Sequence, residues 1–177
     1  MNKVLTLLLA SLLLPACLSA QPTRSADDWG PWVFLMGQWV GEGGGQPGEG
    51  VGEFAFYFDL DGKVLVRKNR ADYPATKDRP AFSHEDLMVI YSEPNGTGTR
   101  RAICFDNEGH VIEYAVEFSA ERGTFTFLSA AVASAPRYRL TYTKGATDQV
   151  SVKFEVAPPG KPDAFSTYVE AVAHRKN

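Results

Sequence analysis

Two short segments of the chain combine histidines with carboxylates. One contains His84 and Asp86, and the other contains Asp106 and His110. Such a set can bind a divalent metal ion, or serve as acid and base on a bound ligand. The alternative is structural, because turns are rich in polar residues and the spacing matches no established metal motif. The sequence also lacks Gly-x-Ser-x-Gly, His-Glu-x-x-His and a phosphate-binding loop. We therefore expect no catalytic residue and no metal ligand, and favour a binding protein over an enzyme.

A second group of candidates consists of aromatic side chains around one arginine. Phenylalanines alternate along residues 54–58, and pairing across the turn Asp61-Gly62 places Arg67 on the same face. A buried arginine needs an anionic partner, because an unpaired buried charge is costly. That partner is either a ligand or an internal carboxylate, and a bulge that turns Arg67 to solvent is the third alternative. Arg139 is a further candidate. The predicted ligand-binding residues are Phe54, Phe56, Phe58, Arg67, Tyr114, Tyr138 and Tyr142.

Short runs in which apolar and polar residues alternate, separated by turn residues, must position these side chains. Ten such runs at regular intervals indicate an all-β fold. They span residues 38–44, 51–59, 63–73, 86–92, 99–106, 110–118, 124–129, 137–143, 149–156 and 164–175. Connected strands that each carry one apolar face can bury it by closing on themselves. We predict a single antiparallel up-and-down β-barrel of about ten strands in residues 28–177, with a short helical turn at 28–36 that caps one end.

The up-and-down order assigns each turn to one end of the barrel. Turns at 60–62, 93–98, 119–123 and 144–148 share the capped end with the helical turn. The loops at the opposite end are the longer and more Gly- and Pro-rich ones, so this end is the predicted mouth: 43–50, 74–85, 106–110, 129–136 and 157–163. Strands four to six are neighbours, so His84, Asp86, Asp106 and His110 are expected to meet there as a mouth cluster.

The start of the first strand carries a resemblance to a known superfamily. Gly37-Gln38-Trp39 resembles the Gly-x-Trp signature of calycins, which include lipocalins, fatty-acid-binding proteins and avidins. The stretch from Phe34 to Gly43 is similar to nitrobindins, which are ten-stranded barrels. The resemblance implies that Arg175 stacks on Trp39, with Gly37 as the third structural residue. A solvated Arg175 is the alternative. The resemblance also implies that interior Arg and Tyr side chains hold a ligand carboxylate, as in fatty-acid-binding proteins.

The resemblance to nitrobindins raises the question of haem. In that family a histidine near the C-terminus ligates the iron, in a pattern close to Thr-His-Leu-x-Ala. Thr167-Tyr168-Val169-Glu170-Ala171 matches this pattern with Tyr168 in place of the histidine, and His174 lies at the strand end. The alternation of residues predicts that Tyr168 points outward. We therefore expect no cofactor, with haem and a nitrobindin-type activity as the alternative.

The N-terminus is typical of an exported protein. Lys3 precedes an apolar run, and small residues follow as far as Ala20. The run is shorter than the roughly 20 apolar residues of a membrane-spanning helix. We predict a signal peptide at 1–20, a linker at 21–27 and a periplasmic or secreted mature protein. The alternative is a lipoprotein anchored through Cys17, because Leu14-Pro15-Ala16-Cys17 resembles a lipobox.

The net charge limits the classes of binding partner, and the cysteine content limits how the fold can be stabilised. The net charge is −3 and no basic block is present, which argues against nucleic acid. Cys104 has no intrachain partner in the mature chain, so the fold depends on burial and not on a disulfide. The sequence thus predicts an exported calycin-like barrel that binds a small apolar or amphipathic molecule in its interior. The alternatives are an enzyme that uses haem or the mouth cluster, and an envelope interaction module with a filled barrel.

Overall fold

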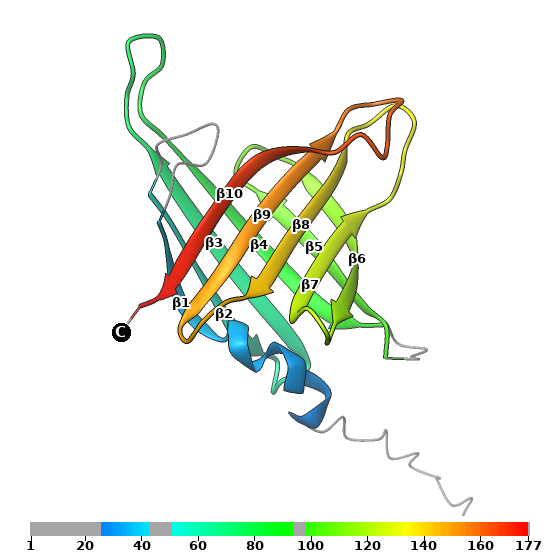
Figure 1. Cartoon of the computed structure of the whole chain (residues 1–177). Helices are drawn as coiled ribbons and strands as arrows, with labels where there is room; N and C mark the ends of the chain where they lie inside the picture. The colour runs from blue at the N-terminus through cyan, green and yellow to red at the C-terminus, as the bar shows by residue number, and fades with distance from the viewer. Residues whose placement is uncertain (1–25, 43–50, 94–97, 177) are drawn as a thin grey trace, which may run out of the picture.

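Ten antiparallel strands form one closed barrel in the computed structural model, which describes residues 26–42, 51–93 and 98–176. Each strand pairs with its neighbours in the chain, and the last strand pairs with the first to close the sheet (Figure 1). The prediction of an all-β, up-and-down barrel is confirmed. The strands are β1 (Gly37–Glu42), β2 (Val51–Asp59), β3 (Val64–Tyr73), β4 (Phe82–Ser92), β5 (Arg100–Asp106), β6 (Val111–Ser119), β7 (Thr124–Ser129), β8 (Arg137–Lys144), β9 (Gln149–Ala157) and β10 (Ser166–Arg175).

A 3-10 helix, η1 (Ala26–Leu35), covers one end of the barrel, as expected (Figure 1). The Trp32 ring stacks on Phe125 of β7, with the ring centroids 3.8 Å apart. The indole N–H of Trp29 donates a hydrogen bond of 2.9 Å to a carbonyl of the β2–β3 turn. Both tryptophans are buried, so η1 closes this end by packing into the barrel core. The helix begins inside the segment predicted as linker.

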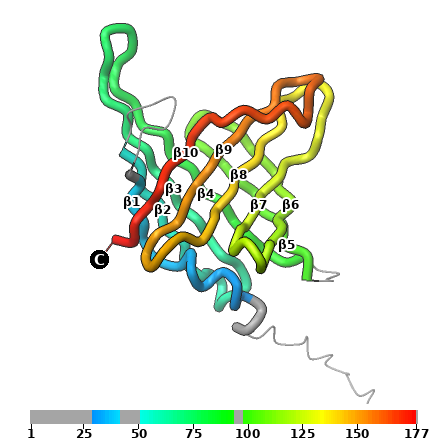
Figure 2. The backbone as a smooth tube through the Cα atoms, in the orientation of Figure 1, coloured from blue at the N-terminus to red at the C-terminus, as the bar shows by residue number. Residues whose placement is uncertain are grey.

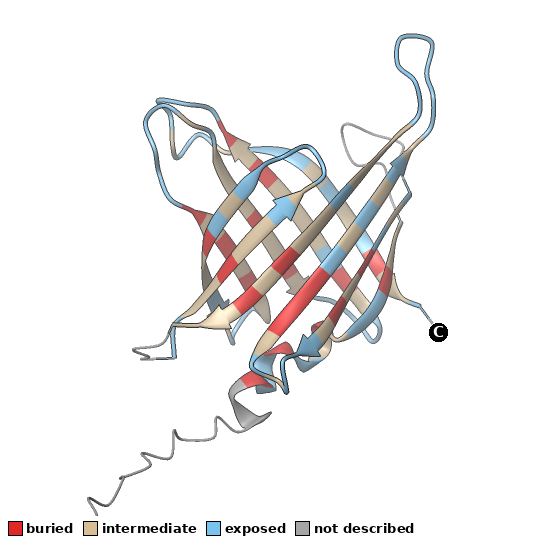
Figure 3. Ribbon diagram, turned by 180° about the vertical axis from the view of Figure 1, so that it is seen from behind, coloured by how far each residue is buried: buried red, intermediate tan, exposed pale blue. Residues whose placement is uncertain are grey.

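Burial alternates along the strands, as their two-residue period requires (Figure 3). In β7, for example, Phe125, Phe127 and Ser129 are buried and the residues between them are only partly so. The largest fully buried side chains belong to one core that includes the tryptophans of η1. They are Trp39, Tyr142, Phe56, Phe125, Phe127, Leu35, Leu65, Met88, Ile90 and Val150. The capped half of the barrel is therefore filled.

The hairpin of β3 and β4 departs from the prediction. β4 begins at Phe82 and not at residue 86, so His84, which was predicted in a loop, belongs to the strand. The pairing of the two strands continues to Tyr73 and Phe82, whose rings stack with centroids 4.6 Å apart. This aromatic contact lengthens the hairpin, which projects beyond the barrel at the end opposite η1 (Figures 1 and 2).

Some sequence-based expectations fall on residues outside the described ranges. The predicted signal peptide at 1–20 and Cys17 lie there, as does the loop at 43–50. In the described part of the chain, no helix combines the length and the apolar character needed to cross a membrane.

Candidate functional site

The mouth half of the barrel contains a cavity of about 660 Å³. Its lining has two different walls. The wall formed by β3 to β6 and their turns carries all the charged side chains of the lining, interspersed with Ala71, Cys104, Ile112 and aromatic rings. Its charged and amide side chains are Arg67, Asn69, Arg79, His84, Asp86, Asp106, Glu108 and His110. The wall formed by β8 to β10 is apolar and aromatic, and includes Leu140, Val152, Phe154, Val156, Val169 and Ala171. A molecule in this cavity therefore meets hydrogen-bonding groups on one side and hydrocarbon on the other.

Arg67 and Asp86 form the deepest charged contact of the polar wall. Arg67 Nη1 lies 2.5 Å from Asp86 Oδ1, and both side chains are 8% exposed. Asn69 donates a hydrogen bond of 2.9 Å to the other carboxylate oxygen. Burial opposes the charge on Arg67 and is the largest single effect, but Asp86 and weaker contributions from neighbouring groups together raise the pKa of Arg67 above its usual range. Burial likewise opposes the charge on Asp86, but Arg67, His84 and Asn69 together hold the pKa of Asp86 below its ordinary value. The pair is thus ionised, and the internal carboxylate is the partner that Arg67 required.

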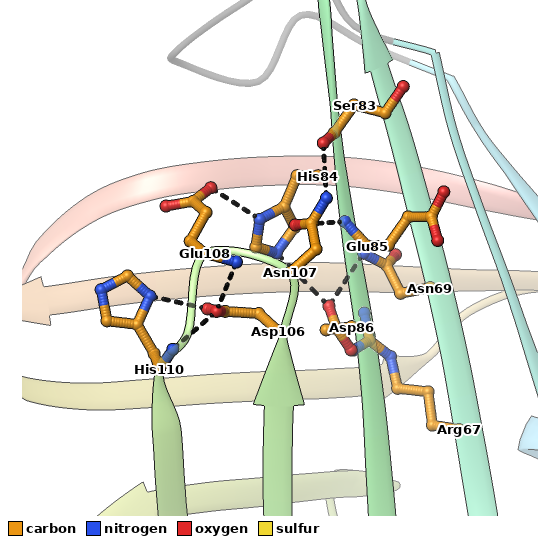
Figure 4. A network of polar contacts seen from close by, with 10 residues as sticks. All are labelled: Arg67, Asn69, Ser83, His84, Glu85, Asp86, Asp106, Asn107, Glu108 and His110. Carbon is orange, nitrogen blue, oxygen red and sulfur yellow. Dashed lines mark hydrogen bonds and ion pairs between the residues drawn. The ribbon is translucent and has the colours of Figure 1, made fainter.

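His84 lies between two carboxylates (Figure 4). Its Nδ1 is 3.0 Å from Glu108 Oε1, and its Nε2 is 3.6 Å from Asp86 Oδ2. These contacts, first with Asp86 and then with Glu108, raise the pKa of His84 to about 9. Asp86 has the larger effect despite the longer distance, because it is the less exposed carboxylate and is less screened by water. His84 is therefore a cation at neutral pH, so it can donate a proton but cannot accept one.

Asp106 and His110 form a second pair, across the β5–β6 turn. Asp106 Oδ2 is 2.8 Å from Nδ1 of His110. Asp106 Oδ1 accepts backbone N–H bonds from Glu108 at 3.0 Å and from His110 at 2.8 Å. Burial works in the opposite direction, but these bonds keep the pKa of Asp106 below its ordinary value. Because Asp106 engages Nδ1, Nε2 is the ring nitrogen of His110 that is left to contact a bound molecule.

Asn107 connects the β5–β6 turn to β4 through hydrogen bonds (Figure 4). The side-chain amide of Asn107 accepts from the backbone N–H of Glu85 at 3.1 Å and donates to the carbonyl of Ser83 at 2.9 Å. Its backbone N–H donates to the carbonyl of Glu85 at 2.9 Å. These bonds hold Glu108 beside His84. Asn107 and Glu108 were not among the predicted site residues, because a polar turn looks the same with or without a partner strand.

The structure brings the four predicted residues of the mouth cluster into one cavity wall. Asp86 and Asp106 are direct partners in the β4–β5 register, and His84 and His110 lie toward the mouth from them. Two carboxylates opposite each other repel. Here each carboxylate has a basic partner, so the repulsion is offset. In the described part of the chain, no group of three or more His, Cys, Asp or Glu side chains is arranged to hold a metal ion.

The predicted ligand-binding residues separate into three groups. Those that line the cavity are Phe54, Arg67, Tyr114 and Tyr138. Phe56 and Tyr142 lie in the packed core and not in the lining. Phe58 does not fit the prediction, because it packs on Trp29 at the capped end and is 40% exposed. Alternation predicts which face a side chain occupies but not its depth along the barrel axis, which is why these residues separate.

Two polar atoms of the core have no hydrogen-bond partner among the described residues. They are the hydroxyl of Tyr142 and Nε of Arg67. The guanidinium carbon of Arg67 lies 5.8 Å from the centroid of the Tyr142 ring. Burial raises the pKa of Tyr142, and its hydroxyl stays neutral. Cys104 also lines the cavity, and burial raises its pKa to about 12, so it remains an uncharged thiol.

Two further expectations are corrected. Tyr168 lines the cavity and does not point outward, because the β9–β10 register shifts between Thr167 and Val169. This shift turns Tyr168 toward Phe154, and the two rings meet edge-on with centroids 6.1 Å apart. Arg139 lies outside the cavity lining, where its Nε donates to Glu155 at 2.6 Å.

Arg175 stacks on Trp39, as the resemblance implied. Its Cζ lies 4.4 Å from the ring centroid, and the two residues are register partners where β1 and β10 close the barrel. The guanidinium also donates to the carbonyls of Phe34 and Met36 at the end of η1. Gly37 has φ of +101°, and a Cβ at this position would lie 2.8 Å from Arg175 Nη1. The glycine of the Gly-x-Trp signature thus leaves space for the arginine.

No protein-family model matches this chain, and no curated protein matches its sequence.

Proposed function

We propose that this protein binds a small amphipathic molecule inside the mouth half of its barrel. The division of the cavity into a polar wall on β3 to β6 and an apolar wall on β8 to β10 carries this proposal. A volume of about 660 Å³ is in the range of small-molecule sites, which run from roughly 300 to 1,000 Å³. The alternative of a filled barrel is not supported, since only the capped half is filled.

The closed barrel of ten strands and the contact between Arg175 and Trp39 support a calycin-like protein. We further propose that the mature barrel is periplasmic or secreted. The apolar run after Lys3 and the small residues up to Ala20 support this proposal. Mass spectrometry of the mature N-terminus distinguishes cleavage after Ala20 from lipidation of Cys17.

The binding test uses a fluorescent apolar probe and a matched pair of variants. Ala171 lines the cavity, and Val172 is its neighbour on the outer face, 41% exposed. We expect wild-type protein to bind N-phenyl-1-naphthylamine with saturation. Ala171→Trp fills the cavity and abolishes saturable binding, whereas Val172→Trp adds the same side chain outside and leaves binding unchanged. Equal binding by both variants, or none by the wild type, would refute an interior site.

We propose that the ligand is not haem. The residue at the position of the nitrobindin histidine is Tyr168, which is 48% exposed at the mouth. His84 is held as a cation by two carboxylates, so its nitrogens have no lone pair for iron. Titration with hemin is expected to give no Soret band beyond that of free hemin. A saturable band at one equivalent would count against this proposal.

A second candidate function is acid–base catalysis on the bound molecule. The observation that favours it is the pairing of His110 with Asp106, which leaves Nε2 to contact a bound molecule beside the cationic His84. Native mass spectrometry of protein purified from its own cell envelope identifies a co-purified molecule. Conversion of that molecule by the wild type but not by His110→Ala supports an enzyme, and its recovery unchanged from both supports a binding protein.

A further inference from the structure

Three basic side chains of the polar wall each contact a carboxylate of the same wall. Arg67 pairs with Asp86 at 2.5 Å, His84 with Glu108 at 3.0 Å, and His110 with Asp106 at 2.8 Å. These three pairs account for every basic side chain that the β3–β6 wall contributes to the cavity among the described residues, apart from Arg79 at the lip.

Arg79 differs from these three basic residues in its position. Its guanidinium lies 4.2 Å from the Phe82 ring centroid on the projecting hairpin, and the residue is exposed. Water therefore screens its charge, and it contributes little to the field inside the cavity.

A ligand with a net charge gains little from a wall in which Arg67, His84 and His110 already contact carboxylates. An anion that approaches Arg67 also meets the carboxylate of Asp86, which contacts Nη1 of the guanidinium, while the unpartnered Nε is buried. A cation that approaches Asp86 meets Arg67 and His84 in the same way. Either ion loses its hydration on entering the cavity without finding an unpaired counter-charge. An uncharged molecule avoids this penalty and can still exchange hydrogen bonds with the polar wall.

We propose that the barrel selects amphipathic ligands without net charge, and that Asp86 and Glu108 set this selectivity by neutralising Arg67 and His84. The ligand class is a molecule with hydroxyl, carbonyl or ether groups along one edge and hydrocarbon along the other. This inference rests on the proposed binding function. It also separates this cavity from the carboxylate-binding mode of fatty-acid-binding proteins, because the ligand carboxylate is replaced by a carboxylate of the chain itself.

The test compares three competitors that share one chain and differ in the head group: dodecanol, dodecanoate and dodecylammonium. Each displaces N-phenyl-1-naphthylamine from the wild-type protein at neutral pH. We expect dodecanol to be the strongest competitor. Displacement by dodecanoate or dodecylammonium at an equal or lower concentration would overturn the proposal. No binding of the fluorescent probe to the wild type would instead refute the proposed binding function.

Charge variants then test whether the preference for dodecanol comes from neutralisation of Arg67 and His84 or from the greater hydrophobicity of the alcohol. Asp86→Asn leaves Arg67 unneutralised and is expected to shift the ratio of dodecanoate to dodecanol affinity about tenfold toward dodecanoate. Glu108→Gln acts on His84 at an exposed turn, where folding tolerates the change, and is expected to shift the ratio about twofold in the same direction. Asp61→Asn removes the same charge at the capped end and leaves the ratio unchanged. An unchanged ratio in folded Asp86→Asn and Glu108→Gln would overturn the role of these carboxylates.

Discussion

Arg175 of the last strand stacks on Trp39 of the first strand, and its guanidinium donates to two carbonyls at the end of η1. The Arg175 side chain therefore connects the β1–β10 pairing, which closes the barrel, to η1. Its Nε also contacts Asp148 Oδ1 at 2.9 Å. The contact between Arg175 and Trp39 joins residues that are far apart in the sequence, so no local segment of the unfolded chain can form it.

We expect Arg175→Ala to lower the free energy of unfolding by about 3 kcal/mol, since it removes the ring contact and charge-assisted hydrogen bonds. For a domain of this size, that change lowers Tm by roughly 10 °C. The control is Lys176→Ala, which removes only an exposed ion pair with Glu53 and is expected to change stability by less than about 0.5 kcal/mol. Thermal unfolding followed by circular dichroism measures both. Equal effects of the two substitutions would show that Arg175 is an ordinary surface residue.

The unpartnered hydroxyl of Tyr142 leads to a second prediction. A buried polar group without a hydrogen bond opposes folding by roughly 1–3 kcal/mol. Tyr142→Phe removes the hydroxyl and keeps the ring, so we expect stability to be unchanged or to rise by about 1 kcal/mol. Urea unfolding measures the change. A loss of more than about 1 kcal/mol would show that the hydroxyl has a partner in the folded protein.

Ser129→Ala is the matched control for this substitution. Ser129 is also buried, but its hydroxyl accepts a hydrogen bond of 2.8 Å from the backbone N–H of Tyr138. Its removal leaves that N–H without a partner and is expected to destabilise the barrel by about 1–2 kcal/mol. The two substitutions each remove one buried oxygen and are expected to act in opposite directions.

The overall fold follows from local patterns. Alternation with a period of two and turn residues at regular intervals determine the strands, and the order of the turns determines the two ends of the barrel. The mouth cluster was predictable for the same reason, because consecutive strands of an up-and-down barrel are neighbours. The start of β4 was predicted at residue 86 and not at Phe82, because Ser83, His84 and Glu85 are all polar. They face a polar cavity wall on one side and solvent on the other, so no hydrophobic alternation marks them as strand.

Other features of the site depend on register and irregularity, which the sequence does not encode in a simple pattern. Arg67 was expected to have an anionic partner, but the choice of Asp86 required the β3–β4 register, in which Asn69 and not Arg67 is its direct partner. The position of Tyr168 follows from a single register shift in β10. Such shifts depend on tertiary contacts, so alternation alone placed Tyr168 on the wrong face.

The buried pair of Arg67 and Asp86 leads to a third prediction. Removing one partner leaves the other as a buried charge, so Arg67→Met is expected to destabilise the barrel by about 3–5 kcal/mol. Removing both charges in Arg67→Met/Asp86→Leu avoids that penalty and is expected to restore stability to within about 1–2 kcal/mol of the wild type. Urea unfolding of the single and double variants forms the thermodynamic cycle. Additive losses would show that the two side chains act independently.

The ionisation of His84 makes the stability of the barrel depend on pH. The pKa of His84 is about 9 in the folded protein, against an ordinary value of 6.5. Its pairing with Asp86 and Glu108 therefore stabilises the fold fully below pH 6.5, and the contribution declines as the pH rises and is lost above pH 9. Because the side chain is partly exposed, we expect this contribution to be on the order of 1 kcal/mol.

An NMR titration of the histidine ring protons measures this pKa directly. We expect the His84 resonance to have a midpoint near 9 in the wild type. Glu108→Gln keeps the shape of the side chain but removes one of the two carboxylates, so the midpoint falls toward the ordinary value. The difference in unfolding free energy between wild type and His84→Asn should shrink over the same pH range as His84 loses its proton. A midpoint near 6.5 in the wild type would show that neither carboxylate holds the His84 cation in solution.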